Sequence, residues 1–169
     1  MQSSTGAYRD ANHVPILTDG LITKKTITFA GATTDAWGND GGALDGGALF
    51  TVTGLVFCKL IAVCETGNDL TGANATVSVG IGGATTIFLP VETATQIDGG
   101  QLWANDAANG TSLIVGAEGA AAGNLPEWAL MGTNIILTVA TANVTGGKLD
   151  FYCIWRPISA TGNVADSGL

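Results

Sequence analysis

The side chains that most often carry catalysis or bind metals are few in this sequence. Histidine occurs once, as His13, and the three cysteines are Cys58, Cys64 and Cys153. A Ser-His-Asp or Cys-His site needs a base held rigidly beside its nucleophile, and His13 lies in a segment without regular hydrophobic spacing. One histidine and three cysteines at these separations match no zinc pattern. We therefore expect no enzyme activity, no cofactor and no bound metal.

One loop contains the ligand type that calcium prefers. Residues 35–47 include Asp35, Asp40 and Asp45 among several glycines. Carboxylate and carbonyl oxygens suit Ca²⁺, but the order is not that of an EF-hand. The Gly-Gly-Asp pattern of calcium-binding β-roll repeats occurs only once where several copies are needed. The favoured interpretation is a plain polar loop, and calcium binding is the alternative.

Carbohydrate chemistry is a further possibility. Glycoside hydrolysis needs two carboxylates about 5–9 Å apart, and no spacing among the acidic residues indicates such a pair. Tryptophans stack on sugars in binding modules, and Trp37, Trp103 and Trp128 lie in or near expected loops. Trp103 follows Leu102 directly, and Trp128 lies close to Leu130. Packing in the core or at an interface is therefore the favoured interpretation of these two tryptophans.

Charge and cysteine usage limit the partners and the compartment. The 169-residue chain has a net charge of −8, which repels nucleic-acid phosphates and anionic lipids. The longest apolar run, residues 55–64, is interrupted by Lys59 and is too short to span a bilayer. We expect neither nucleic acid nor membrane as a partner. Cys58 and Cys64 would lie about 20 Å apart in one strand, so free buried thiols in a reducing cytoplasm are expected.

Alternating hydrophobicity predicts the elements that must carry these residues. Period-two runs such as 76–81 and 134–141 indicate half-buried strands. Residues 55–64 are apolar on both faces, which predicts a central strand or one whose second face meets another subunit. With eight to ten such strands, we predict an all-β fold, an antiparallel β-sandwich or jelly roll, over residues 22–157.

The last two expected strands give the most detail. Residues 134–141 and 148–156 flank a glycine-containing segment at 142–147, which predicts a hairpin. Alternation assigns one side of the second strand to the core, namely Leu149, Phe151, Cys153 and Trp155. The one short helical turn is expected at residues 126–131.

Both ends are expected to lie outside the sandwich. Residues 1–21 are polar, with scattered apolar side chains and no period, which predicts an extended N-terminal arm that reaches at most about 65–70 Å. A partly disordered N-terminal tail is the alternative. Residues 158–169 are polar and are expected to form a flexible C-terminal tail.

Two stretches resemble structural proteins of tailed-bacteriophage particles. Residues 6–16, Gly-Ala-Tyr-Arg-Asp-Ala-Asn-His-Val-Pro-Ile, are similar to the "RDANRVP" type of opening in such proteins. Residues 134–141 and 146–159 look like the closing strands of phage β-sandwich proteins. The resemblance covers the two ends, and the middle shares only its general character.

The resemblance implies a capsid decoration, or cement, protein that binds the outer surface of the phage head, often as a homotrimer. The implied partners are the major capsid protein or neighbouring virion subunits, and the implied location is the virion, assembled in the host cytoplasm. We expect the arm to dock on an adjacent subunit through Tyr8, Arg9, Val14, Pro15 and Ile16. Two alternatives are a tail or fibre adaptor of the virion and a carbohydrate- or receptor-binding β-sandwich module.

Overall fold

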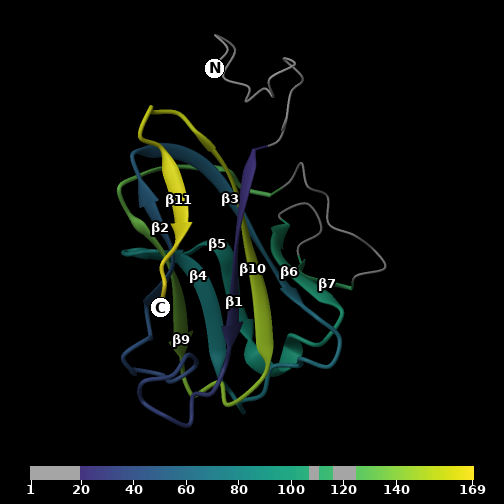
Figure 1. The fold of residues 1–169 in the computed structure, drawn as a ribbon. Helices are drawn as coiled ribbons and strands as arrows, with labels where there is room; N and C mark the ends of the chain where they lie inside the picture. Colours follow the sequence, from purple (N-terminus) through teal and green to yellow (C-terminus); the bar gives the residue numbers. More distant parts are fainter. Residues whose placement is uncertain (1–19, 107–110, 116–124) are drawn as a thin grey trace.

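Two antiparallel β-sheets pack face to face in the computed structural model, which describes residues 20–106, 111–115 and 125–169 (Figure 1). The six-stranded sheet has the order β1-β10-β3-β6-β7, with β8 also paired to β3. The five-stranded sheet has the order β11-β2-β9-β4-β5. The expected all-β sandwich is confirmed.

The strands of the first sheet are β1 (Leu21–Thr28), β3 (Leu55–Cys64), β6 (Gln101–Asp106), β7 (Thr111–Val115), β8 (Trp128–Met131) and β10 (Lys148–Pro157). Those of the second are β2 (Gly47–Thr53), β4 (Thr76–Ile81), β5 (Ala84–Thr93), β9 (Asn134–Ala140) and β11 (Asn163–Asp166).

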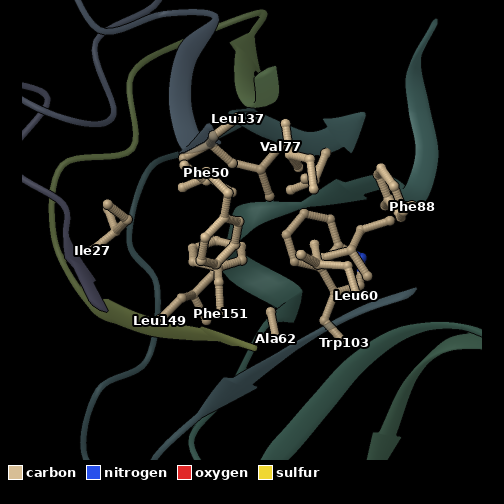
Figure 2. Packing of buried hydrophobic residues seen from close by; sticks show 14 of the residues in the cluster. Ile27, Phe50, Leu60, Ala62, Val77, Phe88, Trp103, Leu137, Leu149 and Phe151 are labelled. Atoms are coloured by element: carbon tan, nitrogen blue, oxygen red, sulfur yellow. The ribbon is translucent and has the colours of Figure 1, made fainter. Parts of the chain in front are cut away.

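The core lies between the sheets, where alternate side chains of both meet (Figure 2). Phe50 and Phe88 of the five-stranded sheet and Leu60, Trp103 and Phe151 of the six-stranded sheet are almost fully buried. The core face that alternation assigns to β10 is confirmed, since each of its four side chains is buried. β3 is also central, as expected, because β10 pairs with one side of it and β6 and β8 with the other.

The predicted hairpin at residues 142–147 is wrong. β9 pairs with β2 and β4, whereas β10 pairs with β1 and β3, so the connection crosses from one sheet to the other. Two strands of a hairpin share one sheet, but the apolar sides of β9 and β10 cover the core from opposite directions. Val144 in the connection is fully buried, donates its N–H to the Gly38 oxygen at 2.8 Å and accepts from the Gly31 N–H at 2.9 Å.

Residues 126–131 do not form the expected helical turn. Trp128–Met131 is β8, which pairs with Leu55–Cys58. β6 pairs only with the C-terminal half of β3, so the backbone N–H and C=O groups on the same side of Leu55–Cys58 need another partner. Pairing with β8 provides it. Pro90 lies within β5, which is at the sheet edge, where a missing N–H is tolerated.

The expected flexible tail at residues 158–169 is also wrong, since it contains β11, which pairs with β2. Val164 of β11 is buried between the sheets. At the other end of the chain, Leu21 belongs to β1 and not to the arm. The other residues of the expected arm, apart from Gly20, are residues 1–19, which lie outside the described residues.

Candidate interaction surface

The three cysteines, which are strong nucleophiles when ionised, lie inside the sandwich. Cys58, Cys64 and Cys153 are buried free thiols, as expected. Burial, together with the charges of Asp69 and Asp98, raises the pKa of Cys64 to about 11. The pKa of Cys153 is also raised, first by a hydrogen bond with Cys58 and then by burial. Protonated thiols are poor nucleophiles and poor metal ligands, so Cys64 and Cys153 serve as core side chains. His13 lies outside the described residues.

Asp45 and backbone hydrogen bonds hold the 35–47 loop in place. The Asp45 carboxylate accepts hydrogen bonds from the Gly41 N–H at 3.1 Å and from the Val139 N–H at 2.9 Å. The Asp40 N–H donates to Asn143 Oδ1 at 2.9 Å. Within residues 20–106, 111–115 and 125–169, no group of three or more His, Cys, Asp or Glu side chains is placed to hold a metal ion. The calcium alternative therefore has no ligand set there.

The three tryptophans considered for sugar stacking have different environments. Trp37 is 8% exposed and Trp103 is fully buried, so neither presents a ring for sugar stacking. Trp128 is 41% exposed and therefore not part of the core, so of the expected alternatives only packing at an interface is left for it, and its Nε1 donates to the Ile87 oxygen of β5 at 3.0 Å. Its indole joins β8 of one sheet to β5 of the other and helps close that side of the sandwich.

The outward side of the six-stranded sheet presents an apolar surface at the end where β3 begins and β10 ends. Strand register aligns Ile22 of β1, Ile154 of β10 and Lys59 of β3 in one row across the sheet. In the next row, Arg156 lies beside Phe57. Leu55 pairs with Met131 of β8, and its oxygen accepts from the Ile158 N–H at 2.9 Å. We name the apolar members the outer apolar face: Ile22, Leu55, Phe57, Met131, Ile154 and Ile158.

This face exposes more apolar surface than a strand exterior normally does. Met131 is 75% exposed, Ile22 61% and Ile158 44%, while Leu55, Phe57 and Ile154 are half-buried. Three of the six large hydrophobic side chains that are exposed in the described chain therefore lie on or beside this one face. Apolar side chains gathered in one patch indicate a contact surface, whereas single exposed ones need no explanation.

Cations lie among these apolar side chains. Lys24 Nζ lies 2.7 Å from the buried Asp150 carboxylate and 5.3 Å from the Tyr152 ring centre. Arg156 lies 4.9 Å from the Phe57 ring centre, and its Nη2 is 2.7 Å from Glu127 Oε2.

Burial alone would raise the pKa of Asp150. The hydrogen bonds from Lys24 and Thr26 outweigh this effect, and the pKa is lowered. Lys59 lies in the same row as Ile22 and Ile154 and makes no ion pair with any described residue.

Comparison with protein-family models, with curated proteins and with solved structures finds no match for this chain. No helix among the described residues is long and apolar enough to cross a membrane. The arm residues expected to bind a partner, Tyr8, Arg9, Val14, Pro15 and Ile16, all lie outside the described residues.

Sequence reasoning missed most of the outer apolar face. One part was visible, since residues 55–64 are apolar on both sides, which predicts a central strand or one whose second face meets another subunit. Met131 was assigned to a helical turn and Ile158 to a flexible tail, so neither was expected beside Leu55. Residues 128–131 are all apolar and show no two-residue alternation, so no signal in the sequence marks β8.

Proposed function

We propose that this protein is a structural subunit of a tailed-bacteriophage virion, specifically a capsid decoration protein on the outer surface of the head. The outer apolar face is the observation that carries the proposal. A sandwich whose core is already closed gains nothing in its own stability from exposing Met131, Ile22 and Ile158, but a subunit in contact with neighbours buries such a face. The similarity of residues 6–16 to the opening of phage structural proteins is the reason for proposing a tailed-bacteriophage particle as the assembly.

The role needs many weak contacts and no chemistry. A decoration protein is repeated over the lattice, so modest interface burial in each copy adds up to strong retention on the particle. A closed arrangement such as a homotrimer would repeat one face-to-neighbour contact around a symmetry axis. The partners are accordingly the major capsid protein and neighbouring copies, with Tyr8, Arg9, Val14, Pro15 and Ile16 as the arm contacts.

The test is co-sedimentation with phage heads assembled without this protein. The full chain should sediment with the heads and raise their resistance to heat. A chain lacking residues 1–16 should stay folded, because the core begins only in β1, and should no longer bind. Binding undiminished by the deletion would remove the role of the arm. Binding to purified tails but not to heads would replace the decoration role with that of a tail adaptor.

A further inference from the structure

We infer that the outer apolar face of one copy is covered by the N-terminal arm, residues 1–19, of a second copy. This inference rests on the proposed function, because it names the occupant of the face that the function requires. Three observations carry it: where the described chain begins, the length of the arm, and the chemistry shared by arm and face.

The arm joins the domain beside the outer apolar face. Leu21 pairs with Trp155 at the edge of the sheet. Gly20 lies so close to the Trp155 backbone that a Cβ on Gly20 would be 2.6 Å from the Trp155 oxygen. β1 begins at the end of the six-stranded sheet where β3 begins and β10 ends (Figure 1). Met131 lies at this end because it pairs with Leu55, and Ile158 because its N–H donates to the Leu55 oxygen.

The length of the arm allows it to reach a neighbouring copy. At the start of β1, Gly20 has φ of +119°, outside the extended region, so the chain turns off the β1 axis at this residue. Nineteen residues reach at most about 63–68 Å, whereas a ten-residue strand such as β10 is about 33 Å long. The arm is thus long enough to leave its own domain and cross the whole face of the next one.

The arm carries side chains that match this face. Tyr8, Val14 and Ile16 are apolar, as are the side chains that the face exposes. The arm also contains the carboxylate of Asp10, which has the charge that would complement Lys59 in the face. A sheet face offers side chains and no free backbone groups, so Pro15, which lacks an N–H, costs nothing in such a contact.

Thiol labelling tests the inference because the native cysteines are all buried. Met131→Cys places one accessible thiol in the face, and Val91→Cys, at a 57% exposed position of the other sheet, is the matched control. Alkylation by a maleimide is followed above and below the concentration at which light scattering detects association. If nine faces in ten are covered, Cys at 131 should react about tenfold more slowly at the higher concentration, with no change at 91.

Two further variants identify the occupant. Val14→Asp combined with Ile16→Asp, in the full chain, should abolish the protection of Cys at 131. Mixing this double variant carrying Met131→Cys with chains that have a native arm should restore the protection, because the native arms reach the labelled faces.

Three outcomes would overturn the inference. Equal labelling at both concentrations with a fast rate means that the face is uncovered. Protection that persists on dilution means that the arm covers its own domain. Protection unaffected by the arm substitutions means that another surface of the second copy is the occupant. All labelling is done without phage heads, so loss of head binding with protection intact would refute the decoration role and leave this inference standing.

Discussion

Lys25 and Asp166 tie the first strand of the sandwich to the last. Lys25 lies on the inner side of β1 and is only 4% exposed, and its Nζ donates to Asp166 Oδ1 at 2.6 Å and to the Leu169 oxygen at 2.9 Å. Thr23 Oγ1 adds a hydrogen bond to the Val164 oxygen at 2.9 Å. These contacts join the edges of the two sheets on the side where β1 and β11 meet.

Removal of the Asp166 carboxylate should therefore weaken the closure. Asp166→Ala leaves a buried ammonium with one acceptor fewer, and we expect a loss of about 1–3 kcal/mol in the free energy of unfolding, measured by urea denaturation. Asp35→Ala removes an equal charge from an exposed loop position and should change the stability little. Lys25→Met in the Asp166→Ala background should recover part of the loss, and failure to do so would show that the ammonium is not the cause.

Alkaline pH should destabilise the protein through Cys64. Its folded-state pKa of about 11 exceeds the usual value of a thiol. The contribution of the protonated Cys64 thiol to the free energy of unfolding is therefore complete below about pH 8.5 and is lost as the pH rises toward 11. Cys64→Ala should flatten the decline in unfolding free energy over this range by about 1–2 kcal/mol. Some decline should remain, because the pKa of Cys153 is raised too. Parallel stability curves for the two proteins would contradict this assignment.

The two buried tryptophans of the six-stranded sheet should respond differently to loss of the indole N–H. Trp155 Nε1 donates to Thr23 Oγ1 at 2.9 Å, whereas Trp103 Nε1 has no hydrogen-bond partner among the described residues. Trp155→Phe should cost about 1 kcal/mol more than Trp103→Phe, since the second change also removes an unsatisfied donor. Thermal unfolding of both variants measures the difference, and an equal or reversed order would refute the prediction.

The crossing connection between β9 and β10 should depend on Gly38. A Cβ at residue 38 would lie 2.3 Å from the Val144 oxygen, and φ is +101°. Gly41 has φ of +71° with nothing near its Cβ, so it is the matched control. Gly41→Ala should cost about 1–2 kcal/mol from the backbone alone, and Gly38→Ala clearly more. Similar losses for the two variants would mean that the loop moves away from Val144 at little cost.

Alternation was sufficient to predict the sandwich, the central position of β3 and the buried side of β10. These features depend on which side chains must leave water, and that information is local. The partners of a strand are not local. A glycine-containing segment such as 142–147 is compatible with a hairpin or with a crossing between sheets. Only the need to cover the core from both sides decides for the crossing.

The same limit applies to β11 and to the outer apolar face. Val164 is one apolar residue among small polar ones, and its strand forms because β2, more than a hundred residues earlier, offers a free edge. The sequence indicates that β3 is apolar on both sides, but whether neighbouring strands leave its outer side uncovered is decided by the register of β8 and β10.

The pairing of β1 with β10 affects the order of events during synthesis. β1 has no other strand partner in the described structure, so its hydrogen-bonding edge stays open until residues 148–157 have left the ribosome. At about 5–20 residues per second the delay is about 6–24 s, during which an apolar strand edge is exposed to other nascent chains. Lys24 and Lys25 lie in the middle of that strand, and charged side chains on an open edge oppose aggregation. Before Lys25 becomes the buried partner of Asp166, it thus helps to keep the unfinished chain soluble.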